Sequence, residues 1–208
     1  MDIINKYFPN LTIGQREQFA LLKEIYFEWN TKINVISRKD IGQLYEHHVL
    51  HSLAIAKIIK FSKNTHILDV GTGGGFPGIP LAILFPDSHF HLIDSIGKKI
   101  TVVEAVSSSL GLQNVFSEQT RVEALNKKYD FIVSRAVTSF PEFYNWVKNK
   151  INPVSKNNLK NGIIYLKGGD IKDEIKDFYT STTIFEIADF FNEPFFETKK
   201  IIYLPIKF

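Results

Sequence analysis

A glycine-rich segment directly after a short apolar run carries the clearest chemical signal in the sequence. The run covers His66 to Val70 and includes Asp69, and the residues that follow it read Gly-Thr-Gly-Gly-Gly-Phe-Pro-Gly as far as Gly78. Glycines let the backbone approach a ligand closely, and ligands of open α/β sheets bind beyond the carboxyl ends of the strands. The segment therefore predicts a nucleotide-cofactor site that includes Asp69, Gly71, Gly73 and Gly75.

Two cofactors compete for this site. Gly73, Gly75 and Gly78 satisfy the dinucleotide pattern G-x-G-x-x-G, and Asp94 lies roughly where that fold places its ribose-binding acid. Asp69 favours S-adenosylmethionine, because a carboxylate would repel a pyrophosphate but suits an ammonium and a sulfonium charge. A Walker loop is excluded, since no Lys-Ser/Thr pair follows the glycines. S-adenosylmethionine is the preferred cofactor, and a dinucleotide-dependent oxidoreductase is the alternative.

Two acidic residues beyond later strands are candidates for holding the nucleoside. Asp94 ends the second predicted strand, where its two oxygens could accept both ribose hydroxyls or, alternatively, cap the next helix. Arg121, Val122 and Glu123 occupy the loop where the adenine should lie. Glu123 has a second interpretation as a solvated acid in a first helical turn.

The residue types also restrict the methyl acceptor. The chain contains no cysteine, which excludes disulfides, thiolate metal sites and pyrimidine C5 methylation, a reaction that needs a thiolate nucleophile. It also lacks the Asn/Asp-Pro-Pro-aromatic motif of enzymes that act on exocyclic amines. A ring nitrogen such as guanine N7 already carries a free lone pair, so alignment of the reacting atoms suffices. We therefore assign no general base, and we expect no metal site.

Alternating strand and helix patterns position these residues. Repeated strand-helix units imply a parallel sheet with right-handed crossovers. Pro205 places the last strand at an edge of the sheet, because proline cannot donate to a strand ladder. The predicted strands are 66–70, 89–93, 114–117, 131–134, 162–166, 183–190 and 200–206, and the predicted helices are 80–85, 98–110, 141–147 and 170–179.

Residues 1–60 have a different pattern and are predicted to form a helical extension packed on the main domain, 61–208. Thr12 and Gln15 resemble a capping box at the start of a long helix with an apolar core face. Ser37 and Asp40 are candidate caps for a second helical tract, 44–59. We therefore expect one α/β domain with an N-terminal helical extension.

Composition is compatible with an intracellular enzyme. The 208 residues include 44% hydrophobic residues, enough for a substantial core, and the net charge of +3 permits an anionic partner. No stretch approaches the 18 apolar residues of a membrane helix. We expect a cytoplasmic monomer without a membrane anchor.

Taken together, the motifs resemble those of one bacterial family, the glucose-inhibited division protein B family of small-subunit (16S) rRNA guanine-N7 methyltransferases. This resemblance implies a Rossmann-like class I S-adenosylmethionine-dependent methyltransferase fold, a mostly parallel seven-stranded sheet with helices on both faces. It also implies methyl transfer to N7 of a guanine in 16S rRNA. The segments that carry it are Trp29-Asn30 with Asn34 and Ser37, Asp69 to Gly73, Phe76 to Leu81, Asp94-Ser95 with Gly97 to Lys99, Arg121 to Glu123, Ser134 to Ala136, and Leu166 to Gly168.

Family contacts to the cofactor can be carried over to matching positions. The resemblance implies cofactor contacts at Gly71, Phe76, Val122, Glu123 and Arg135. The chain departs from the family's Arg-His-x-Leu-Asp-Ser pattern, which reads His-His-Val-Leu-His-Ser here over residues 47–52. The roles of the two substituted positions, His47 and His51, are therefore open.

Basic residues near the predicted strand ends are candidates for binding the RNA. They are Lys98, Lys99, Arg121 and Lys167, with Arg38 from the extension. Their alternative interpretation is a solvated surface, the commoner fate of lysine. We expect 16S rRNA or the small ribosomal subunit as partner. A non-catalytic RNA- or ribosome-binding protein on a methyltransferase scaffold is a further alternative, which the complete set of cofactor residues disfavours.

Overall fold

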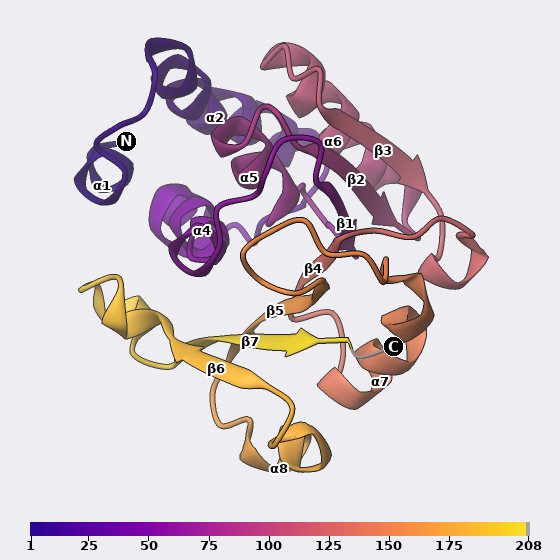
Figure 1. Cartoon of the computed structure of the whole chain (residues 1–208). Helices are drawn as coiled ribbons and strands as arrows, with labels where there is room; N and C mark the ends of the chain where they lie inside the picture. Colours follow the sequence, from indigo (N-terminus) through magenta and orange to yellow (C-terminus); the bar gives the residue numbers. More distant parts are fainter. Residues whose placement is uncertain (207–208) are drawn as a thin grey trace.

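A seven-stranded sheet organises the chain, with the strand order β3-β2-β1-β4-β5-β7-β6 (Figure 1). The structure is a computed structural model that describes residues 1–206. Strands β1 to β5 pair in parallel, whereas β7 runs antiparallel to both β5 and β6. The predicted fold class is confirmed. The strands are β1 His66–Val70, β2 His89–Asp94, β3 Val115–Gln119, β4 Phe131–Arg135, β5 Gly162–Gly168, β6 Thr183–Glu186 and β7 Lys199–Pro205.

Helices cover both faces of the sheet, because alternate residues of each strand point to opposite sides. On β1, Ile67 belongs to a core cluster with residues of α2, α5 and α6, whereas Leu68 belongs to a second cluster with residues of α7 and α8. The helices are α1 Asp2–Tyr7, α2 Ile13–Lys32, α3 His51–Leu53, α4 Ile55–Ile58, α5 Gly78–Leu84, α6 Gly97–Ser109, α7 Phe140–Val147 and α8 Lys172–Ile175.

The N-terminal extension packs on the α5 and α6 side of the sheet, where its indigo and purple helices gather in Figure 1. The predicted capping box is present, since Thr12 accepts from the backbone of Gln15 at 3.2 Å and donates its own N–H to the Gln15 side chain at 3.0 Å. The second helical tract begins as a π-helix, Leu44–Leu50. The division of the chain at residue 60 stays a prediction.

Asp40 was predicted as a helix cap, and this is wrong. Asp40 precedes a short 3₁₀ helix, Ile41–Gln43, but its side chain accepts no hydrogen bond from the backbone N–H groups of that helix. Its two carboxylate oxygens are instead bonded to the rings of His47 and His48. Two histidine partners have taken the place of the backbone amides that a cap would bind.

The C-terminal part differs most from the sequence prediction. The predicted helix 170–179 is only the single turn of α8 followed by a 3₁₀ helix, and the predicted strand 183–190 ends at Glu186. Pro205 does not mark an edge strand, because β7 lies between β5 and β6. Proline is tolerated there because β6 reaches only as far as Tyr203, so Pro205 lies beyond the end of its neighbour.

None of the helices formed by residues 1–206 is long and apolar enough to cross a membrane.

Candidate functional site

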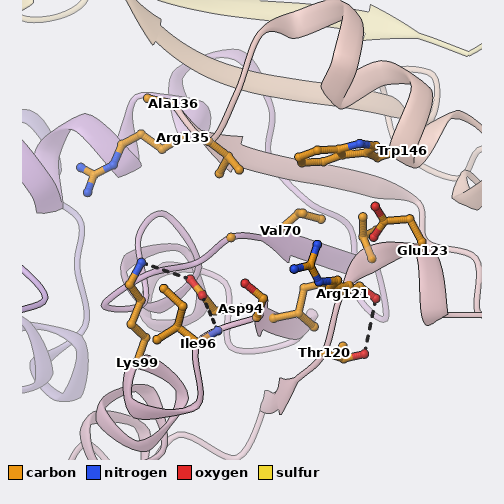
Figure 2. A pocket seen from close by; sticks show the side chains of 15 residues that line it. Val70, Asp94, Ile96, Lys99, Thr120, Arg121, Glu123, Arg135, Ala136 and Trp146 are labelled. Atoms are coloured by element: carbon orange, nitrogen blue, oxygen red, sulfur yellow. Dashed lines mark hydrogen bonds and ion pairs between the residues drawn. The ribbon is translucent and has the colours of Figure 1, made fainter.

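A cavity of about 420 Å³ opens at the carboxyl ends of the parallel strands, where the sequence predicted the cofactor site (Figure 2). In Figure 2, Trp146 of α7 and Glu123 lie across the cavity from Asp94 and Lys99. Its walls come from the ends of β1, β2, β3 and β4. The lining residues are Val70, Gly71, Ile93 to Ile96, Lys99, Thr120 to Glu123, Arg135 to Val137 and Trp146.

Asp94 joins the end of β2 to the glycine loop. Its Oδ2 accepts the backbone N–H of Gly73 at 3.0 Å, and its Oδ1 accepts that of Ile96 at 2.9 Å. The ammonium of Lys99 lies 3.7 Å from Oδ2. Asp94 therefore orders the loop while it lines the cavity, and helix α6 begins without a side-chain cap from it. Its predicted ribose contacts stay a prediction.

Gly71 is required by a close approach at the cavity wall. Its φ of +67° lies in the left-handed region, and a Cβ at this position would lie 2.5 Å from a methyl carbon of Val137. A side chain at residue 71 would force Val137 in the loop after β4 to move and would strain the backbone.

Asp69 lies beneath the glycine loop and is fully buried. Its Oδ2 accepts the hydroxyl of Thr72 at 2.7 Å and the N–H of Gly78 at 2.8 Å, so the carboxylate shapes the loop. Among the described residues, Oδ1 has no hydrogen-bond partner. Burial raises the pKa of Asp69 to about 7, against the effect of these two donors. Asp69 is not a lining residue of the cavity, and its predicted contact with the cofactor charges stays a prediction.

The extension contacts the same loop from the other side. The hydroxyl of Tyr26, on α2, donates to the carbonyl oxygen of Gly74, and the Tyr26 ring lies 4.9 Å from the ring of Phe76. Both side chains are buried. Phe76 thus lies behind the cavity wall and supports the loop.

Arg135, at the end of β4, is held mainly by the extension. Its Nη1 donates to the carbonyl oxygen of His47 at 3.2 Å, its Nη2 pairs with Nδ1 of His48 at 3.0 Å, and its guanidinium lies 5.3 Å from the Phe76 ring centre. Burial lowers the pKa of Arg135 to about 10, so it stays protonated near neutral pH. Within residues 1–206, partners are present for two of its five N–H groups.

The structure brings together five of the predicted cofactor residues as cavity lining: Gly71, Asp94, Val122, Glu123 and Arg135. The other four, Asp69, Gly73, Gly75 and Phe76, are not lining residues and belong to the strand end and loop behind it.

The predicted RNA-binding residues divide into three groups. Lys99 and Arg121 line the cavity. Lys98 and Arg38 are exposed to solvent. Lys167 is already engaged, because its ammonium donates to Glu174 at 2.8 Å and to the carbonyl of Thr138 at 3.0 Å. Binding of RNA by these residues stays a prediction.

Sequence reasoning missed several apolar residues of the cavity, among them Ile96, Val137 and Trp146. Ile96 carried a usable signal in its sequence position, two residues after a strand-end acid, and the structure leaves it 42% exposed. Trp146 carried none, because an aromatic residue on an amphipathic helix is read as core. The described residues contain no group of three or more His, Asp or Glu side chains that could hold a metal ion.

Comparison with known proteins identifies the family. A family model described as rRNA small subunit methyltransferase G matches residues 15–201. The chain belongs to this family. The curated Flavobacterium johnsoniae protein named ribosomal RNA small subunit methyltransferase G is 59% identical to this chain, over 100% of this chain and 99% of the relative. The Bacteroides thetaiotaomicron protein of that name shares 53%, over 99% of this chain and 100% of the relative. The resemblance is confirmed, and neither alternative function is supported.

Solved structures of other proteins share the fold. A mutant of MtNAS in complex with S-adenosylmethionine matches with a TM-score of 0.58 and 11% identity, over 93% of this chain and 76% of that chain. Precorrin-6y C5,15-methyltransferase from Geobacter metallireducens matches with a TM-score of 0.57 and 9% identity, over 84% of this chain and 92% of that one. At such low sequence identity, these structural likenesses establish only the fold of this chain.

Proposed function

We propose that this chain transfers the methyl group of S-adenosylmethionine to N7 of a guanine in 16S rRNA. The observation that carries the proposal is the arrangement of Asp69, Asp94 and Arg135 around the carboxyl ends of β1, β2 and β4, in a chain of the rRNA small subunit methyltransferase G family. Each of these side chains has a charge or a free hydrogen-bonding atom suited to one part of the cofactor.

The methionine end of the cofactor is a zwitterion with an adjacent sulfonium. Three N–H donors of Arg135 lack a partner among the described residues, and so does the buried Oδ1 of Asp69. A cationic group near Asp69 would also lower its raised pKa and keep it ionised. The site therefore fits the methionine end with both of its charges.

The nucleoside end fits the opposite part of the cavity. Asp94 offers its carboxylate to the ribose hydroxyls, and Ile96, Val122 and Trp146 offer apolar surface to the adenine. A dinucleotide pyrophosphate fits less well, because Asp69 would repel it.

When bound, S-adenosylmethionine supplies an electrophilic methyl carbon on its sulfonium. Guanine N7 needs no deprotonation before it attacks, so the protein contributes alignment of the reacting atoms and exclusion of water. The ionisable cavity residues then act in binding: Lys99 pairs with Asp94, and Glu123 is exposed. No residue of this chain is assigned as a general base.

The RNA side of the proposal places the substrate over the same strand ends. Lys99 and Arg121 line the cavity, and Lys98 and Arg38 are exposed basic residues outside its lining. The substrate is 16S rRNA or the small ribosomal subunit, and the enzyme works on it as a cytoplasmic monomer. The rRNA named in the family description supports this partner.

Mapping of modified nucleotides tests the proposal in cells. Small-subunit rRNA from cells that lack this protein should lose one 7-methylguanosine, and the native gene should restore it. The Asp94→Ala variant should restore it poorly. An unchanged set of 7-methylguanosines in the deletion strain would contradict the proposal.

A further inference from the structure

The guanidinium of Arg135 is oriented by residues far from it in the sequence. It belongs to β4 of the methyltransferase sheet, yet the two groups that accept its hydrogen bonds, the His47 carbonyl and the His48 ring, belong to the extension. In Figure 2, Arg135 points away from Asp94 and toward the ribbon of that extension. The orientation of Arg135 at the edge of the cavity therefore depends on His47 and His48 of the N-terminal extension.

The chemistry of the guanidinium determines the tautomer of His48. A guanidinium can only donate, so Nδ1 of His48 must accept and the ring proton must lie on Nε2. That Nε2 is bonded to a carboxylate oxygen of Asp40, which can only accept when ionised. Asp40 therefore selects the tautomer that can bind Arg135.

Surrounding contacts restrict the side chains of Asp40 and His48. The second oxygen of Asp40 is bonded to Nδ1 of His47, and the His47 ring stacks on Phe195 with 3.9 Å between ring centres. The His48 ring lies 5.3 Å from that of Phe76, which also contacts Arg135. His48 itself is only 12% exposed.

We propose that Asp40 and His48 are positioning residues for the methyltransferase reaction: Asp40 fixes the ring of His48, and His48 fixes Arg135 to receive the carboxylate of S-adenosylmethionine. The extension then completes the cofactor site. This inference rests on the proposed function, because it assigns a role in binding that cofactor.

Two substitutions of His48 separate its ring nitrogens. His48→Asn places an amide oxygen near the position of Nδ1 and can still accept from Arg135, whereas His48→Gln places its amide near Nε2 and cannot. Calorimetry should show S-adenosylmethionine bound about tenfold more weakly by His48→Gln, the loss of one charge-assisted hydrogen bond. Binding by His48→Asn should stay within about threefold of wild type.

A double variant distinguishes an effect of His48 that acts through Arg135 from an effect on cofactor binding that is independent of Arg135. If His48 acts through Arg135, His48→Gln should weaken binding little further in an Arg135→Lys background. The matched control is His91→Gln in the middle of β2, outside the cavity lining, since His91 also bonds through both ring nitrogens, to Tyr129 and to Glu118. This control should leave cofactor affinity unchanged.

The outcomes are distinguishable. Wild-type affinity in folded His48→Gln, equal loss in His48→Asn and His48→Gln, or full additivity with Arg135→Lys would each overturn the positioning role. Failure of the wild-type protein to bind S-adenosylmethionine would instead overturn the proposed function.

Discussion

The hydroxyl of Tyr26 donates to the carbonyl oxygen of Gly74 at 2.5 Å, across 48 residues of sequence. This bond attaches helix α2 to the middle of the glycine loop. Tyr26 is fully buried, and burial raises the pKa of its hydroxyl far above its usual range, so the hydroxyl remains a donor. The glycine loop behind the cavity wall therefore depends on the extension for its shape.

Tyr26→Phe should reduce both stability and cofactor affinity. It leaves the buried Gly74 carbonyl without its donor, a loss of about 1 to 3 kcal/mol in the free energy of unfolding. Tyr45→Phe is the matched control, because Tyr45 also donates from the extension to backbone carbonyls, those of Phe19 and Ala20. Urea unfolding should show both variants destabilised, and calorimetry should show weaker S-adenosylmethionine binding in Tyr26→Phe alone. Equal affinities would show that the bond does not shape the site.

Asp94→Ala should weaken S-adenosylmethionine binding by about 2 to 4 kcal/mol, since two charge-assisted hydrogen bonds to the ribose are lost. It also removes the bonds to Gly73 and Ile96. The control is Asp130→Ala, because Asp130 is a buried aspartate that accepts the N–H of His66 at the amino end of β1. Asp130→Ala should lower stability without changing the affinity of the folded protein. An Asp94→Ala variant with wild-type affinity would remove Asp94 from the site.

Asp69 should make the protein less stable as the pH rises. Its pKa is about 7 in the folded protein, whereas the ordinary pKa of an aspartate, as in the unfolded chain, is 3.8. Between these two pH values only the folded state keeps the proton. The stabilisation is complete below about pH 4 and is lost as the pH rises toward 7, by about 1.4 kcal/mol per pH unit.

Asp69→Asn should remove this pH dependence. The amide oxygen can still accept from Thr72 and Gly78, so the loop should keep its shape. Urea unfolding at pH 4.5, 5.5 and 6.5 measures the difference in unfolding free energy between wild type and variant, in which the contributions of other titrating groups cancel. A difference that does not change with pH would show that the Asp69 pKa is not raised.

RNA binding should depend steeply on salt. With about five phosphate contacts, the logarithm of the affinity should fall against the logarithm of salt concentration with a slope near −4. Lys98→Ala and Arg38→Ala should each reduce that slope by about one, because both side chains are exposed and come from different parts of the chain. Lys60→Ala is a control, since Lys60 is exposed before β1 at the opposite end of the sheet. Slopes unchanged in Lys98→Ala and Arg38→Ala would exclude phosphate contacts there.

Much of the fold could be predicted because strand and glycine patterns are local. The predicted strands 66–70 and 89–93 matched β1 and β2 almost to the residue, and with them the position of the cavity at their carboxyl ends. β7 could not be placed, because strand order depends on long-range pairing that Pro205 alone does not determine.

The contacts between the extension and the site were not predictable. Tyr26 fits an apolar helix face, and nothing in its spacing indicates that its hydroxyl meets Gly74. Asp40 and His48 lie eight residues apart in a segment whose π-helical geometry no sequence pattern indicated. Their meeting with Arg135 is a consequence of tertiary packing.

The central claim is methyl transfer to guanine N7, and a substrate without that atom tests it most directly. Small subunits are reconstituted with 16S rRNA transcribed with either ordinary or 7-deaza guanosine triphosphate, and binding of the enzyme to each is measured first. With labelled S-adenosylmethionine, the ordinary subunits should gain label recovered as 7-methylguanosine, and the 7-deaza subunits should gain none despite equal binding. Equal labelling of both subunits, or label recovered in any other nucleoside, would contradict the account.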